Sequence, residues 1–339
     1  MSVLMPVYKG DEYLSEAVDS ILNQTFSDFE FIIICDDPTD ETHHIFDKYQ
    51  QNDSRIMVYY QERQGLVNSL NKGISLARGE YIARMDADDI SLSTRFEKQV
   101  EFMDKNLEIG ICGTWVKTIG DSSGSVWNNP CDHDTIKSRM LFESVIAHPS
   151  IILRKDIFLS NNLAYRQDET YAEDYGLWVR AIKKLKFANI PEILLHYRVH
   201  NSTSNKYKQK EISNRVRLSQ VRELGISPTN VEIEIHEALS CYRFDVNDDF
   251  ISNAKSWLQK LQNANFSMKI YPEPAFSNVL ANRCWYLICY NFRYLGLGSW
   301  NCFHNPKLSQ SVNLSYVQKA RLLLKNEVRL FLLFGRLFI

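Results

Sequence analysis

The sequence has 339 residues, of which 45% are hydrophobic and 24% are charged, and its formal net charge at pH 7 is −2. These values are typical of a soluble globular protein with one large domain or two modest ones. A nearly neutral chain has no general attraction for nucleic acid, so we expect no nucleic-acid partner.

The seven cysteines are scattered and form no C-x-x-C pair, which indicates reduced thiols in a cytoplasmic protein. The N-terminal residues have no basic segment and only a short apolar run, so we expect no secretory leader. The chain also has no stretch of about 18 uncharged apolar residues, which a transmembrane helix would require.

The first half of the chain alternates apolar runs with segments in which apolar residues recur at helical spacing. The runs predict strands at residues 3–7, 29–35, 56–60, 81–85 and 109–114, with amphipathic helices between them. Thr94 and Glu97 have the spacing of a capping box at the start of the helix before the last of these strands. This alternation predicts an α/β fold, with a mostly parallel sheet and helices on both faces.

Residues 115–170 are less regular, a helix returns at 173–184, and short strands are predicted near residues 187 and 193–197. Beyond about residue 212 the pattern is helical, without further alternation of strands and helices. We therefore predict an α/β domain over residues 1–210, a helical extension over residues 211–317, and a basic amphipathic helix over residues 318–339.

Three carboxylates, Asp86, Asp88 and Asp89, follow the strand predicted at residues 81–85. Because like charges repel, such a cluster is more stable around a divalent cation, and its oxygen donors suit Mg2+ or Mn2+. At the carboxyl end of a parallel strand, the cation would lie where open α/β sheets bind ligands. The alternative is an acidic turn ahead of the helix that follows Ser93.

A second acidic pair, Asp36 and Asp37, also ends a predicted strand and precedes a predicted helix. If the first, second and fourth strands are neighbours, Asp37 and Asp86 line one crevice. Asp37 would then be placed to accept a hydrogen bond from the ring N–H of a base. The alternative is a helix N-cap.

Five segments in order, residues 3–8, 20–26, 31–37, 70–74 and 77–89, resemble the motifs of family 2 glycosyltransferases. These are inverting enzymes of the GT-A fold, and the chain is especially similar to bacterial O-antigen and capsule transferases over about residues 1–205. Each motif alone is weakly specific, but five in order are highly specific. One departure is Pro38, where the family often has glycine after the acidic pair.

The resemblance implies that Pro6 and Tyr8 lie beside the uracil of a UDP-sugar and that Asp37 accepts its N3–H. Arg63 and Asn71 would help to hold the nucleotide.

The resemblance also assigns roles to the three carboxylates of the D-x-D segment. Asp88 would be the main ligand of Mn2+ or Mg2+, Asp86 would contact the metal or the ribose, and Asp89 would support the site from behind. A bound cation would neutralise the charge that develops on the diphosphate leaving group.

Glu173 and Asp174 resemble the base motif of the family. Inversion needs one carboxylate to deprotonate the acceptor hydroxyl as it attacks the anomeric carbon. We expect Asp174 to be this base, with Glu173 as the substitute. The alternative is an acidic first turn of a helix, which the helix dipole favours.

Two further segments resemble the family. His148 belongs to a segment that precedes the acceptor-side strand, and its alternative is a structural histidine. Arg198 and His200 belong to the segment after the transferase core, where both would meet the diphosphate. The alternative for these two residues is a solvated loop.

These features predict an inverting, metal-dependent transfer of glucose, galactose or an N-acetyl derivative from a UDP-sugar to a lipid-diphosphate-linked glycan in O-antigen synthesis. One alternative is a nucleotidyltransferase, but residues 5–10 do not supply the glycine-rich phosphate loop that it needs. Another is a non-catalytic nucleotide-sugar-binding or scaffold protein at the membrane. That alternative predicts loss of Asp88 or Asp174, and both are present.

The C-terminal segment, residues 318–339, is apolar but interrupted by basic residues. At helical spacing Arg321, Lys325, Arg329 and Arg336 fall on one face. This pattern predicts a helix in a membrane interface, which would attach the protein peripherally to the inner face of the cell membrane. The alternative is a helix packed on the core with its basic face in water.

Overall fold

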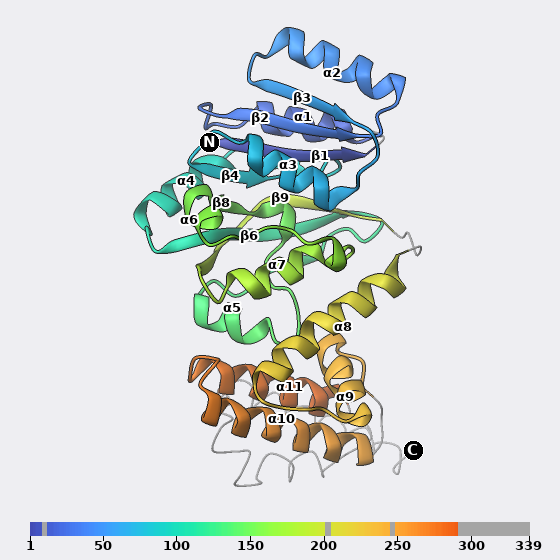
Figure 1. The fold of residues 1–339 in the computed structure, drawn as a ribbon, viewed down its shortest axis with the longest axis vertical. Coiled ribbons are helices and arrows are strands. Elements are labelled where there is room, and N and C mark those ends of the chain that lie inside the picture. Colours follow the sequence, from blue (N-terminus) through green and yellow to red (C-terminus); the bar gives the residue numbers. More distant parts are fainter. Residues whose placement is uncertain (9–11, 201–204, 245–247, 291–339) are drawn as a thin grey trace, which may run out of the picture. The chain divides into compact units, whose positions relative to one another are not determined.

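The structure is a computed structural model that describes residues 1–8, 12–200, 205–244 and 248–290 (Figure 1). The chain divides into two compact units. The first consists of residues 1–140 and 144–217, and the second of residues 141–143 together with those from residue 218 onward. The division falls within α8 (Lys206–Glu223), and the helix predicted over residues 318–339 lies outside the described residues.

The first unit begins with the predicted alternation of strands and helices. Its elements are β1 (Ser2–Tyr8), α1 (Leu14–Leu22), β2 (Glu30–Asp36), α2 (Asp40–Asn52), β3 (Ile56–Gln61), α3 (Leu66–Leu76), β4 (Tyr81–Arg84), β5 (Ile90–Ser91) and α4 (Arg95–Lys105). The neighbours in the order β3-β2-β1-β4 are all parallel. The carboxyl ends of these strands therefore meet at one edge of the sheet.

Side-chain alternation along these strands divides the core into two layers. Val3 and Ile33 pack in one hydrophobic cluster with the apolar sides of α1, α2 and α4. Leu4 and Ile32 pack in another with the apolar side of α3. The predicted arrangement of helices on both faces is therefore confirmed.

The second half of the unit completes a mixed sheet. Its elements are β6 (Ile109–Gly120), β7 (Val126–Trp127), α5 (His133–Arg139), η1 (His148–Ser150), β8 (Ile152–Arg154), α6 (Lys155–Ser160), η2 (Gln167–Glu169), α7 (Glu173–Ala181) and β9 (Lys186–Val199). The main order is β3-β2-β1-β4-β8-β6-β9-β5, in which β8 is antiparallel to both of its neighbours. In Figure 1, β8 lies between the parallel β1–β4 region and β6.

The capping box predicted at Thr94 is wrong. Thr94 precedes α4 with φ −96° and ψ 4°, away from the extended geometry typical of an N-cap residue, and its side chain makes no cap hydrogen bond. The Glu97 carboxylate instead accepts a hydrogen bond from the Thr25 hydroxyl at 2.8 Å. A long-range contact has therefore replaced the local one.

The second unit is helical and contains α9 (Asn230–Cys241), α10 (Asp248–Met268) and α11 (Ala275–Tyr290). Leu141 and Phe142 are fully buried in its hydrophobic cluster. The buried guanidinium of Arg283 pairs with Glu143, donates to Leu239 O at 3.1 Å and lies 4.9 Å from the Phe142 ring centroid. Among the described helices, none is long and apolar enough to span a bilayer.

Candidate active site

A cavity of about 430 Å³ opens at the carboxyl ends of β1 and β2. This is where open α/β sheets bind ligands, and the volume suits a small molecule. Its walls come from these strand ends, the start of α3 and the start of α7, and are formed by Pro6, Val7, Tyr8, Asp36, Arg63, Gly65, Leu66, Ser69, Asp86, Thr170, Tyr171, Glu173 and Asn205. The predicted site residues among them are Pro6, Tyr8, Arg63, Asp86 and Glu173.

The two acids that end β2 have different environments. The Asp36 carboxylate accepts hydrogen bonds from Gln64 N at 2.7 Å and Gly65 N at 2.8 Å, so it holds the loop before α3. Asp37 is half-buried, adopts a left-handed φ of 57° and does not line the cavity. A left-handed non-glycine residue costs energy, which indicates that the surrounding loop fixes Asp37 in this conformation. Its contact with a base stays a prediction.

Tyr8 and Arg63 form one wall of the cavity. Tyr8 is 45% exposed, and the Arg63 guanidinium lies 5.0 Å from its ring centroid. A guanidinium over an exposed ring is worth about 0.5–1 kcal/mol, so a planar or anionic ligand could replace this contact at a modest cost.

Asn71 does not line the cavity. Its side-chain nitrogen donates to Tyr165 O at 2.9 Å, and its side-chain oxygen accepts from Tyr165 N at 3.0 Å. Because both ends of the amide bind the backbone, the structure favours positioning of the Tyr165 segment over the predicted direct contact with a nucleotide.

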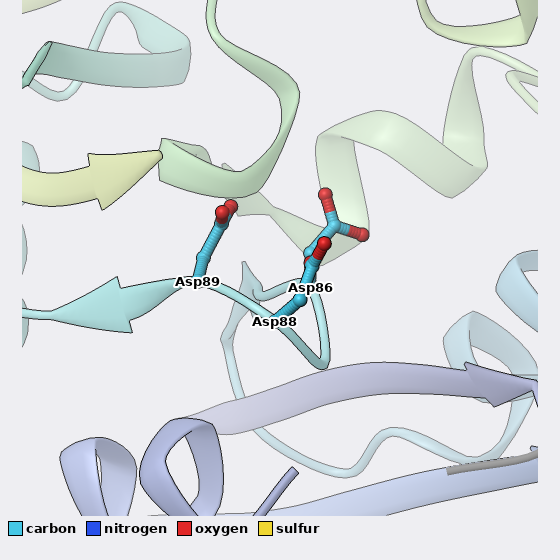
Figure 2. Close-up of side chains that lie close together, drawn as sticks. All are labelled: Asp86, Asp88 and Asp89. Carbon is cyan, nitrogen blue, oxygen red and sulfur yellow. The ribbon is translucent and has the colours of Figure 1, made fainter. Parts of the chain in front are cut away.

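The three carboxylates after β4 form an acidic cluster. Oxygen atoms of Asp86, Asp88 and Asp89 all lie within 4.8 Å of one another, and Figure 2 shows the three carboxyl groups on the same side of the loop. Asp86 is paired with Arg84, whose side chain is 5% exposed. Burial raises the pKa of Asp86, and it raises the pKa of Asp89 well above its usual range.

Arg198 and His200 approach this cluster from the end of β9. Arg198 N donates to Asp89 Oδ1 and Arg198 Nε to Asp88 O, both at 2.7 Å, while Nη2 donates to Glu16 at 2.7 Å. His200 Nε2 lies 2.7 Å from Asp88 Oδ2. The alternative of a solvated loop is wrong for Arg198, because β9 continues to Val199.

The acidic cluster fits a divalent cation. Its carboxylate oxygens are the donors that Mg2+ and Mn2+ prefer, and the His200 imidazole adjoins them. Asp89 Oδ2 is buried without a hydrogen-bond partner, although Asp89 is only 1% exposed. A buried carboxylate oxygen in this condition is costly unless a cation or donor approaches it.

The two acids predicted to supply the general base, Glu173 and Asp174, begin α7. Glu173 lines the cavity, and its Oε2 accepts from Tyr171 N at 2.8 Å. Burial, with a smaller contribution from the charge of Asp174, raises the pKa of Glu173 to about 7. Burial also raises the pKa of Asp174, which is half-buried and does not line the cavity.

His148 is 8% exposed and has the structural role that we gave as its alternative. Its Nε2 forms a hydrogen bond of 2.7 Å with the Tyr165 hydroxyl, and its ring meets Trp178 edge to face at 5.7 Å. Burial holds the pKa of His148 well below its usual range, so the imidazole is neutral. Its contact with an acceptor stays a prediction.

Sequence and fold comparisons identify relatives of the chain. The profile of the family described as Glycosyl transferase family 2 matches residues 2–160. An uncharacterized glycosyltransferase of Haemophilus influenzae is 32% identical over 254 residues, which cover 71% of this chain and 78% of that protein. The O-antigen biosynthesis glycosyltransferase WbnJ of Escherichia coli is 34% identical over 215 residues, which cover 61% of this chain and 82% of WbnJ.

Among solved structures, residues 1–349 of S. aureus TarS match with a TM-score of 0.56 and 18% identity, over 88% of each chain. The match covers 53% of the longer TarS chain, so this chain spans about half of that protein. At this identity the likeness concerns the fold alone, and it confirms the predicted GT-A class with its C-terminal helices.

Proposed function

Because this chain belongs to glycosyltransferase family 2, we propose that it transfers a hexose from a UDP-sugar to a lipid-diphosphate-linked glycan. One observation carries the proposal: the acidic cluster and the acidic start of α7 meet at one cavity, which Asp86 and Glu173 both line. WbnJ acts in O-antigen biosynthesis, and TarS has been crystallised with UDP and with UDP-GlcNAc. These relatives support a UDP-sugar donor and a surface-polysaccharide acceptor.

The donor nucleotide would occupy the cavity beside β1 and β2. Tyr8 and Pro6 would lie against the uracil, Asp37 would accept its N3–H, and Arg63 would move from the Tyr8 ring toward the diphosphate. Asn71 would act indirectly, since it fixes the backbone at Tyr165.

A divalent cation, Mn2+ or Mg2+, would be held by Asp88 and Asp86 and would neutralise charge on the departing diphosphate. Asp89 would support this arrangement, because its carboxylate fixes the backbone of Arg198. Arg198 in turn holds the Asp88 carbonyl, and His200 adjoins the Asp88 carboxylate.

We assign the base to Asp174, with Glu173 as the substitute. The carboxylate takes the proton of the acceptor hydroxyl while that oxygen bonds to the anomeric carbon and the bond to UDP breaks. Burial raises the pKa of both acids, which makes their ionised forms stronger proton acceptors. A single displacement inverts the anomeric centre, so a UDP-α-sugar gives a β-linked product.

We also propose that residues 1–210 form the transferase domain and residues 211–317 a helical extension. Residues 318–339 would bind the inner face of the cell membrane through their basic side, close to a lipid-linked acceptor.

The test is release of UDP in the presence of Mn2+. The UDP forms of glucose, galactose, GlcNAc and GalNAc are each incubated with a GlcNAc- or GalNAc-diphospholipid, with and without enzyme. We expect one donor to give acceptor-dependent release. Asp88→Asn should abolish it, whereas Asp156→Asn, which changes an exposed acid in the first turn of α6, should not. Donor binding without turnover on every acceptor would favour the scaffold alternative.

A further inference from the structure

Arg84 is a buried cation at the end of β4 that the proposed reaction does not use. Its side chain is 5% exposed, and its two terminal nitrogens pair with both oxygens of Asp86. Arg84 Nε is buried and has no hydrogen-bond partner, so the group is oriented by Asp86 rather than by a network of its own. The pairing is bidentate, the arrangement in which an arginine holds a carboxylate most firmly.

The backbone of Arg84 is fixed on both sides. Arg84 N donates to Ile151 O at 3.0 Å, and Arg84 O accepts from Arg95 Nη2 at 2.7 Å. Arg95 is itself fully buried and also donates to Gln99 at 3.0 Å. The Arg95 guanidinium therefore binds the Arg84 backbone and Gln99, whereas the Arg84 guanidinium binds the acidic cluster through Asp86.

The cluster needs a positive charge close by. Among the described ion pairs, its partners are Arg84 on Asp86 and His200 on Asp88. A histidine in this pair is charged only when protonated, so Arg84 is the permanent cation of the two. With three ionised carboxylates, one guanidinium and a neutral His200, the cluster has a net charge of −2.

We infer that Arg84 is a resident counter-cation of the D-x-D segment, which neutralises Asp86 in the absence of metal and competes with a divalent cation for that carboxylate. The inference rests on the proposed metal site. It differs from a positioning role, in which Arg84 would orient Asp86 as a ligand and so strengthen metal binding. The two roles predict opposite changes in metal affinity when Arg84 is removed.

The experiment measures Mn2+ binding without any sugar substrate, by calorimetry and by the rise of the unfolding temperature with Mn2+ concentration. In Arg84→Met the unpaired Asp86 should lower the unfolding temperature of the metal-free protein. The same variant should bind Mn2+ at least about tenfold more tightly, because a nearby positive charge has been removed. Arg84→Lys should lie between wild type and Arg84→Met.

A double variant, Arg84→Met with Asp86→Asn, decides the question even if the single variant does not fold. It leaves Asp88 and Asp89, so it is compared with Asp86→Asn alone, which keeps Arg84 beside the same two carboxylates. Competition predicts tighter Mn2+ binding in the double variant than in Asp86→Asn, because the positive charge beside the two remaining carboxylates has been removed. A positioning role predicts equal binding in these two variants, because Arg84 would act only through Asp86.

The matched control is Arg154→Met. Arg154 is also buried and donates at 3.0 Å to both Glu80 and Tyr81, away from the acidic cluster. The Arg154→Met variant should unfold at a lower temperature than wild type without a change in its affinity for Mn2+. The counter-cation role alone would be overturned if Arg84→Met bound Mn2+ no more tightly than wild type, or if the double variant bound it no more tightly than Asp86→Asn. Absence of Mn2+ binding in wild type would overturn the metal site as well.

Discussion

The sharpest prediction concerns which acid at the start of α7 is the base. Asp174→Asn keeps the shape of the side chain, and its amide oxygen can still accept the hydrogen bond that Asp174 accepts from the Tyr175 N–H. The change removes only the ability to accept a proton from the acceptor hydroxyl. Glu173→Gln likewise retains an oxygen for Tyr171 N, which Glu173 accepts at 2.8 Å. Because both variants preserve these contacts, differences in rate report on chemistry rather than on folding.

The expected loss in Asp174→Asn is roughly 10²–10⁴-fold in kcat, the usual contribution of a general base. At 1.36 kcal/mol for each tenfold, this is about 2.7–5.4 kcal/mol of transition-state free energy. Glu173→Gln should lose less than about tenfold if Glu173 only supports its neighbour. Neither change should weaken donor binding.

The pH dependence provides a second measurement. Because the base must be ionised, wild-type kcat should fall as pH drops through a pKa above the ordinary carboxyl range, and this acid limb should vanish in Asp174→Asn. A folded-state pKa raised above the unfolded value means that stability is lost as pH rises through the folded pKa. Glu173, with its pKa raised to about 7, should therefore make wild type less stable than Glu173→Gln above pH 7.

The assay is UDP release from pH 5 to 9, with donor affinity measured in parallel and Asp156→Asn as the control. If Glu173→Gln is inactive while Asp174→Asn retains activity within tenfold of wild type, the two roles are reversed. If both variants keep wild-type rates, the base lies elsewhere and the assignment to α7 is refuted.

Other predictions test separate parts of the site. EDTA should abolish turnover and Mn2+ should restore it; full activity in the chelator would exclude metal dependence. Arg63→Ala should raise KM for the UDP-sugar about tenfold with kcat little changed, because its contact with the donor precedes chemistry. An NMR coupling constant should show a β-linked product from a UDP-α-sugar, and an α-linkage would contradict a single displacement. Wild type should pellet with anionic liposomes and be released by salt, whereas truncation before Gln318 should prevent pelleting.

The parallel half of the sheet was predictable because β1 to β4 are short apolar runs separated by amphipathic helices. Residues 56–60 and 81–85, for example, correspond closely to β3 (Ile56–Gln61) and β4 (Tyr81–Arg84). The antiparallel β8 was not predictable in the same way. It has only three residues, and its place in the sheet depends on pairing with β4, far away in the sequence.

The carboxylates of the site could be recognised in the sequence as runs of acidic residues, but the side chains that pair with them could not. Arg84 lies inside a run that we treated as apolar, and a charged residue in a predicted buried strand is a signal of a paired carboxylate that we did not use in predicting the site. The contact between Asn71 and Tyr165 joins positions 94 residues apart, which no local periodicity reveals. His148 likewise gave no sign of its bond to the Tyr165 hydroxyl.

Leu141 and Phe142 leave the ribosome well before α9, α10 and α11, whose core they help to complete. During synthesis their apolar side chains therefore have no native partners, and they are candidates for chaperone binding until the later helices emerge. In a protein fragment that ends at residue 210, Leu141 and Phe142 would never acquire these native partners. Such a fragment should aggregate unless both residues are replaced by polar ones, however complete its catalytic groups are.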